Sequence, residues 1–554
     1  MRYILSAAGA ASLALASAPA AAAPSDFTMC DGYPAPTKKV DGMSKGTWLW
    51  GLASRSEDIR RNQKTFGATA ITACDAALAD PLLLPQYWLR HAHLLQAKAT
   101  HQVDAGDADG ALKSLAASDA LAPAGDVFFE RSVILGNRAL RAMAYFKQGK
   151  KDAALAELDA VDKERPYAGI LRDLTLEIRL ANEDDHERQR RLIRENARLA
   201  PGDLNRLFWL AMFYSDFRTA ADIGQEVSFD LPRGRGDWQI VGFADRKYDA
   251  IEKRAAVAGA RAYALAATGA DEASRAAIAE AEADLVEVMA PLPPLAAGEK
   301  YKKSQIADHD SRMHAGQSAQ AKLDRWKAMI ALRGRIGTLT MTTLRPAVDL
   351  RQMESAIALP DLLAHVRIDT PADAQTRDAV VKMVGAQIDA SMAKENKLTV
   401  AELVDLLPRP ETQPMVPAFQ GTGDGYFLSD MNGFYTKREP GSDYLNIRYG
   451  GYVANRATIE ELVLLAAAQQ TRKAGKDAFL IDSRLFVERT LTTYGMYGIN
   501  YGTSNNGYEA RVRILPVTER ALPSGFEHSR WRLIRVADVE ASLGGIYRRE
   551  TAKH

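Results

Sequence analysis

The chain has 554 residues, of which 71 are basic, 70 are acidic and 47% are hydrophobic. This composition argues against a disordered chain and predicts two to four domains with sizeable cores. Nucleic acid is not an expected partner, because nucleic-acid surfaces need clustered Lys and Arg and the charges here are balanced without a long basic run.

The first 22 residues have the pattern of a secretory signal peptide: Arg2, an apolar stretch over residues 4–16, and small residues over 18–23. We expect cleavage after Ala20 or Ala22 and a periplasmic or secreted location. The apolar stretch is shorter than the roughly 20 residues of a membrane span, so no transmembrane segment is expected after cleavage, with a retained anchor as the alternative. No lipid anchor is expected either, because Cys30 lies downstream of the cleavage positions.

The N-terminal extension, residues 23–84, contains the two cysteines of the chain, Cys30 and Cys74. An even pair in an oxidising compartment predicts one disulfide, which would close a loop of about 44 residues. Two buried thiols are the alternative.

Residues 85–290 contain an internal repeat. Two six-residue series share the gaps 3, 4, 5, 4 and 8: Ala99, Gln102, Gly106, Ala111, Leu115 and Pro123, and then Ala142, Tyr145, Gly149, Ala154, Leu158 and Pro166. A partial third copy includes Ala262 and Gly269. Alanine suits close helix crossings, Gly ends the first helix, and Pro follows the second. The pattern predicts stacked helix hairpins.

These gaps resemble the tetratricopeptide repeat (TPR) family, although the units here start at irregular intervals and the two best lack the family's leading Trp. The resemblance implies a TPR-like α-α superhelix whose first helices line a groove for a protein or peptide partner. The implied groove positions are His93, Gln96, Thr100 and Val103, then Ala139, Met143, Phe146 and Lys147. A generic helical bundle, in which these side chains pack against neighbours, is the alternative.

Residues 291–315 begin with three prolines within four residues and are expected to form a linker or loop. Further helices are expected within 316–416, at about 316–334, 371–394 and 399–407. Prolines at 408, 410, 414 and 417 mark the end of this region.

The C-terminal part, residues 425–550, is expected to be a small α+β domain. Apolar residues alternate at Leu445, Ile447 and Tyr449, a helical pattern covers 459–473, and alternation returns over 478–487 and 508–517. The Gly- and Tyr-rich stretch 492–508 predicts a long hairpin turn, with a glycan-contacting loop as the alternative.

Residues 440–520 are similar to an uncharacterised domain of bacterial envelope lipoproteins, which implies a fold and an envelope compartment but no activity. The matching residues are Gly450, Gly451, Thr458, Glu460, Leu464, Ala466, Ala467, Thr471, Gly475, Asp477 and Phe479.

No candidate catalytic motif has the neighbouring residues and secondary structure that its chemistry requires, so no catalytic residue, metal site or cofactor is predicted. The expected fold is mostly α, a TPR-like superhelix followed by the α+β domain, and the expected function is an exported scaffold that binds a protein or peptide. The alternative is an envelope hydrolase or glycan-binding enzyme with its site in the C-terminal domain or near residues 421–435. A purely structural envelope protein is a third possibility.

Overall fold

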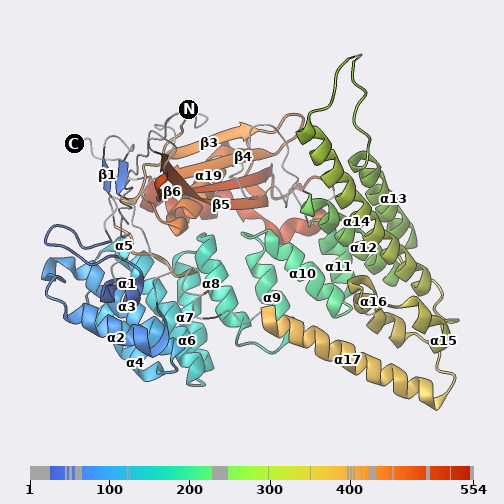
Figure 1. Ribbon diagram of the computed structural model, residues 1–554, viewed down its shortest axis with the longest axis horizontal. Coiled ribbons are helices and arrows are strands. Elements are labelled where there is room, and N and C mark those ends of the chain that lie inside the picture. Colours follow the sequence, from blue (N-terminus) through green and yellow to red (C-terminus); the bar gives the residue numbers. More distant parts are fainter. Residues whose placement is uncertain are drawn as a thin grey trace, which may run out of the picture.

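The computed structural model describes residues 25–43, 46–48, 53–55, 65–121, 123, 125–227, 248–296, 298–349, 351–395, 399, 402, 406–412, 415–422, 432–451, 454–494, 500–524 and 526–548. The predicted signal peptide lies outside the described residues, as do most of the predicted helix 399–407 and residues 423–431 of the alternative site. The protein is mostly helical, with a small antiparallel five-stranded sheet near the C-terminus (Figure 1).

The first half of the chain is built from short helices that follow one another along the lower part of Figure 1. They are α1 (Asp26–Asp31), α2 (Gly67–Ala79), α3 (Trp88–Asp104), α4 (Ala108–Asp119), α5 (Val127–Phe129), α6 (Leu135–Lys147), α7 (Lys151–Glu164), α8 (Gly169–Leu180), α9 (His186–Asn196), α10 (Gly202–Phe213) and α11 (Phe217–Gly224). A π-helical turn, η3 (Glu130–Ile134), joins α5 to α6, and a 3-10 turn, η2 (Pro85–Tyr87), precedes α3. A two-stranded hairpin, β1 (Gly46–Trp48) and β2 (Ala53–Arg55), lies between α1 and α2 in sequence.

Four helix hairpins share one turn geometry. The turns after α3, α6 and α10 place Gly106, Gly149 and Ser215 at positive φ, and Gly269 takes the same place after α12 (Asp249–Ala267). In each turn the next residue donates its N–H to a carbonyl five positions earlier, as Asp107 does to Gln102 at 2.8 Å. This bonding satisfies carbonyls at the helix end and needs a left-handed residue, which Gly adopts without strain.

The next part of the chain contains the long helices α12, α13 (Asp271–Val288), α14 (Lys303–Arg333) and α17 (Pro371–Glu395). The shorter α15 (Met341–Leu344), a 3-10 turn, η5 (Arg345–Ala347), and α16 (Met353–Ala364) lie between α14 and α17. Helix α14 begins at Lys303, so the irregular part of the expected linker 291–315 ends there. Gln305 accepts the Lys302 N–H at 2.8 Å and caps this start. The first turns of α14 are solvated and carry no apolar stripe, which is why their helical character is weak in the sequence.

The C-terminal sheet has the order β3-β4-β6-β5-β7, with antiparallel neighbours throughout. Its elements are β3 (Gly433–Arg438), β4 (Leu445–Gly451), α19 (Arg456–Lys473), β5 (Ala478–Tyr494), β6 (Asn500–Val517), the 3-10 helix η8 (Glu527–Arg532), β7 (Ile534–Arg535) and α20 (Val536–Tyr547). The pairing of β5 with β6 continues as far as Tyr494 and Asn500, so much of the stretch 492–508 belongs to the strands.

Helix α19 fills the core between the sheet and helices α1 to α11, here named the helical layer. Leu462 and Leu465 of α19 pack with Ile447, Phe479 and Ile514 of the sheet, and all five side chains are buried. In Figure 1 the sheet and α19 lie along one edge of the helical layer, above α5 and α8. The C-terminal domain and the helical layer, here named the two parts of the protein, meet at the ends of helices of that layer.

Candidate functional site

The groove positions predicted on α3 lie inside the helix stack. His93 Nδ1 lies 3.1 Å from Asp31 Oδ2 of α1. Gln96 is buried and donates to the Val133 carbonyl and to Asn137 Oδ1, while Thr100 is buried and donates to the carbonyl of Gln96. His93 and Gln96 hold α3 against its neighbours, Thr100 bonds within α3 itself, and the buried Gln96 and Thr100 offer little surface to a partner.

The positions predicted on α6 are more open. Ala139 is fully buried, Met143 and Phe146 are half-buried, and Lys147 is exposed. Met143 packs against two apolar clusters of the helical layer, one around α6 to α8 and one between α3, α4 and α6.

Residues 406–412, here named the bridging segment, lie along α6 and η3. Leu407 packs against the same two clusters as Met143. A Cβ added at Gly136 would lie 3.5 Å from Pro408 Cδ, and the Glu411 N–H donates to Ser132 Oγ at 3.1 Å. The segment therefore runs antiparallel to α6 and η3, from Pro408 beside Gly136 to Glu411 beside Ser132.

A buried charge cluster begins where the bridging segment ends. Both carboxylate oxygens of Glu461, on α19, accept hydrogen bonds from Arg131 Nη2 at 2.9 Å. Oε2 also accepts a hydrogen bond from Arg165 Nη2 at 2.7 Å. Burial opposes ionisation of Glu461, but the attraction of Arg165 and Arg131 outweighs it and holds the pKa of this carboxyl below its usual value. Ion pairing compensates the desolvation of all three charges.

Three further side chains complete this cluster. Glu411 of the bridging segment lies 3.2 Å from Arg165 Nη1 and accepts a hydrogen bond from Thr458 Oγ1. The hydroxyl of Tyr547, on α20, donates to Glu461, and burial raises the pKa of this phenol. The cluster thus joins η3, the end of α7, the bridging segment, α19 and α20.

The neighbouring Glu460 makes a separate contact with the helical layer. Its Oε2 accepts the N–H of Ile170 at 2.7 Å, in the first turn of α8, where the helix dipole favours a negative charge. Arg456, one turn earlier on α19, lies 3.0 Å from the same carboxylate. Arg484 of β5 adds an ion pair to Asp173 of α8 at 3.4 Å.

A pocket of about 490 Å³ lies beside this junction. Its lining residues are Asp173, Leu176, Glu177, Ala200, Gly202, Asp203, Arg206 and Leu406 of the bridging segment. Asn196 Nδ2 donates to the carboxylates of both Asp173 and Asp203, at 3.0 and 2.8 Å. Burial raises the pKa of Asp203 to about 6 and also raises the pKa of Asp173. Such shifted carboxyls suit proton transfer near neutral pH.

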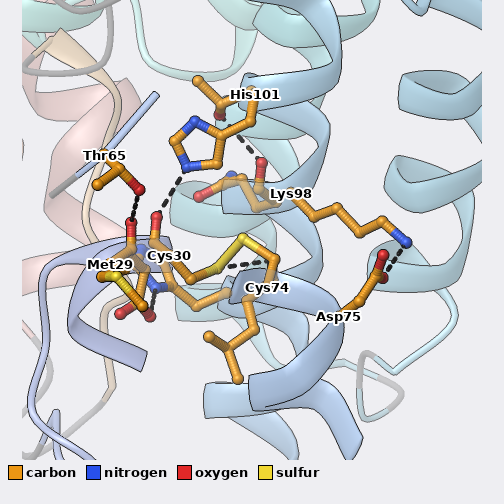
Figure 2. Close-up of a disulfide and its surroundings, with 12 residues drawn as sticks. Met29, Cys30, Thr65, Cys74, Asp75, Lys98 and His101 are labelled. Atoms are coloured by element: carbon orange, nitrogen blue, oxygen red, sulfur yellow. Dashed lines mark hydrogen bonds and ion pairs between the residues drawn. A yellow bond between two sulfur atoms is a disulfide. The ribbon is translucent and has the colours of Figure 1, made fainter. Parts of the chain in front are cut away.

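Cys30 and Cys74 form a disulfide that joins α1 to α2, with a Cα–Cα distance of 4.8 Å (Figure 2). His101 of α3 contacts the Cys30 carbonyl through Nε2 at 2.8 Å, and Thr65 donates to the Met29 carbonyl at 3.2 Å. The N-terminal extension is thereby attached to the first helices.

Sequence reasoning did not find the charge cluster or the pocket. Thr458 and Glu460 appeared among the positions matching the lipoprotein-type domain, with no role in an ion-pair cluster. Glu461 carried no signal because its arginine partners lie about 300 residues earlier. The prolines at 408 and 410 were read as a boundary, whereas both are buried in the bridging segment.

The described ranges contain no group of three or more His, Cys, Asp or Glu residues arranged to hold a metal ion. Among the helices of the described part of the chain, none combines the length and the apolar character needed to cross a bilayer. No family model, curated protein or solved structure matches this chain.

Proposed function

We propose that the chain is an exported scaffold of the bacterial envelope, in which a TPR-like superhelix binds a protein or peptide along α6. The observation that carries the proposal is the bridging segment, which packs against the same two apolar clusters as Met143 and bonds to Ser132 of η3. A helix face that accepts one segment of chain has apolar anchor points to accept another.

The repeat reading is supported by the four hairpin turns that share one bonding pattern. Each unit of a TPR-like stack needs such a turn to return its second helix against the first. The turn after α8 differs, because Asn182 and Glu183 donate to carbonyls three positions earlier, so the proposed superhelix contains one irregular unit.

Export to the periplasm is supported by the signal-peptide pattern and by the disulfide, because disulfides persist in oxidising compartments. We assign the C-terminal domain the role of orienting the superhelix through the Glu461 cluster. Its proposed kinship with an envelope lipoprotein domain agrees with that compartment.

The proposal is tested by comparing partners captured from a cross-linked periplasmic extract. The bait is the chain from Ala23 onward, beside the double variant Met143→Glu, Phe146→Glu. The control variant Val286→Glu, Met383→Glu introduces the same charges at exposed positions, which are 72% and 48% accessible. Folding of each bait is checked by circular dichroism.

A partner held by the wild type and the control, and lost by the folded groove variant, supports the proposal. Equal capture by all three baits, or no partner for any, contradicts it.

The second candidate is an envelope hydrolase or glycan-binding enzyme, and the pocket at Asp173 and Asp203 is the observation that favours it. These carboxyls lie on α8 and α10, beside the C-terminal domain in which a site was expected. Turnover of cell-wall glycans or esters that is lost in Asp203→Asn would support this candidate. A wild-type protein without turnover at any concentration would leave the scaffold as the better account.

A further inference from the structure

We propose that the bridging segment is a built-in ligand, and that the partner is a peptide of the same chemistry, two Leu followed by prolines and an acidic residue, which competes for α6. This proposal rests on the proposed function and names the partner class of the same site. The proposal is supported by three kinds of contact that the segment makes: apolar packing, backbone hydrogen bonds and an ion pair.

The apolar end of the segment is held by packing. Leu406 and Leu407 pack against the apolar cluster of α6 to α8, against which Met143 and Phe146 also pack, and Leu407 packs in addition against the cluster between α3, α4 and α6. Pro408 is buried beside Gly136, and a Cβ at this glycine would lie at van der Waals distance from Pro408 Cδ, 3.5 Å away. These contacts select apolar side chains followed by a proline.

The backbone of the segment is held by hydrogen bonds to two side chains. Asn455 Nδ2 donates to the carbonyls of Arg409 and Pro410 at 2.8 and 3.0 Å, and Ser132 Oγ accepts the N–H of Glu411. The two prolines have no N–H to satisfy, so their burial leaves no backbone donor without a partner.

The charged end of the segment is selected by the cluster. Glu411 is buried, pairs with Arg165 and accepts from Thr458. Arg165 keeps Glu461 as a second partner, so departure of Glu411 does not leave this guanidinium without a countercharge. A competing peptide recovers the lost bonds only if it carries an acidic residue four positions after its second Leu.

The segment competes from within the chain, where its effective concentration is on the order of millimolar. A free peptide with equal contacts should therefore bind the wild type weakly. Weakening the segment alone should raise the apparent affinity, because the groove residues stay unchanged.

The test measures fluorescence anisotropy of a labelled peptide with the sequence of residues 404–413 against the full chain from Ala23. The variant Leu406→Ser, Leu407→Ser removes the apolar anchors of the segment, and we expect it to bind the peptide at least tenfold more tightly than the wild type. A milder variant, Arg409→Ala, removes the 2.6 Å bond from the segment to Tyr508 of β6 and should gain about threefold.

Two controls define the site. Adding Met143→Glu to the double-serine variant should abolish binding, and a peptide with Lys at the position of Glu411 should bind at least tenfold more weakly. Circular dichroism reports whether each variant is folded, and Arg409→Ala keeps the test open if the double variant unfolds.

The proposal is overturned if no folded variant binds the peptide more tightly than the wild type, or if light scattering shows that the released segment pairs two copies of the chain. Capture of a partner that depends on Met143 and Phe146, without any peptide binding, would retain the scaffold and reject the built-in ligand. Peptide binding without a captured partner would retain the built-in ligand and reject the scaffold.

Discussion

At the residue scale, Glu461 is the carboxylate of the C-terminal domain that both Arg131 and Arg165 of the helical layer contact. It is fully buried and contacts Arg131, Arg165 and Tyr547. A buried carboxylate of this kind is not a source of net stability by itself, since desolvation offsets the attraction. Its removal, however, leaves two desolvated guanidinium groups without their shared countercharge.

We therefore expect Glu461→Gln to lower the free energy of unfolding by about 3–5 kcal/mol. The control is Asp349→Asn, which breaks an exposed pair with Arg351 and should change the free energy of unfolding far less. Urea denaturation of both variants measures the difference. Equal effects would show that burial of the Glu461 cluster has little energetic consequence.

The raised pKa of Asp203 predicts how the stability of the folded protein changes with pH. Burial raises its pKa to about 6 from 3.8, so the folded state binds the proton more tightly than the unfolded state. The contribution of Asp203 to stability is therefore most favourable below about pH 4, falls between pH 4 and 6, and is least favourable above pH 6.

Asp203→Asn removes this ionisation, so its stability relative to the wild type should rise by on the order of 2 kcal/mol between pH 4 and pH 8. Thermal and urea unfolding at the two pH values measure it, with Asp310→Asn, 71% exposed on α14, as the control. A relative stability that stays constant with pH would contradict the assignment.

At the element scale, the disulfide fixes α1 to α2 across 44 residues of sequence. Loop-closure entropy gives a stabilisation of about 4 kcal/mol for a loop of this length. The variant Cys30→Ser, Cys74→Ser should therefore melt at a lower temperature and migrate differently on a non-reducing gel. Reductant should lower the melting temperature of the wild type and leave the variant unchanged. A variant that melts with the wild type would rule out a stabilising role.

The elements that sequence reasoning predicted are those with local signals. Gly106, Gly149 and Gly269 mark their hairpin turns because only Gly takes positive φ without strain. The equivalent turn at Ser215 carries a side chain and gave no such signal. The short strand β7 has only two residues and is formed by pairing with β5, which no local pattern reveals.

The groove positions were implied by the resemblance to the TPR family, and their role in binding stays a prediction. Met143 and Phe146 are half-buried and pack against the same apolar cluster as the bridging segment, whereas Gln96 and Thr100 are buried. The partners of Glu461 could not be predicted, since ion pairs between distant residues leave no pattern within a single sequence.

At the scale of the whole molecule, the helical layer and the sheet share their cores. Leu199, after α9, belongs to the apolar cluster of the sheet, and Ala457 of α19 belongs to a cluster of the helical layer. Arg532 also forms a buried ion pair with Glu226 at the end of α11. The two parts should therefore open together.

Hydrogen exchange measures this coupling. In the wild type, peptides from α7, α8 and α19 should reach the same protection, because their opening is one event. In Glu460→Gln, Glu461→Gln we expect α19 to exchange before α7 and α8. The control Arg472→Gln breaks only an ion pair with Glu540 inside the C-terminal domain and should keep exchange concerted. Concerted exchange in the double-glutamine variant would show that the remaining contacts, apolar packing and pairs such as Arg532 with Glu226, suffice to couple the parts.

The long sequence separation within the Glu461 cluster also sets an order of events during synthesis. Arg131 and Arg165 precede Glu461 by 330 and 296 residues. At 5–20 residues per second, their carboxylate partner emerges from the ribosome roughly 15–60 s after they do. Until then both arginines must remain in water, so the edge of the helical layer that later meets α19 cannot close. The edge of the helical layer that meets α19 is therefore completed only after the last quarter of the chain has been made.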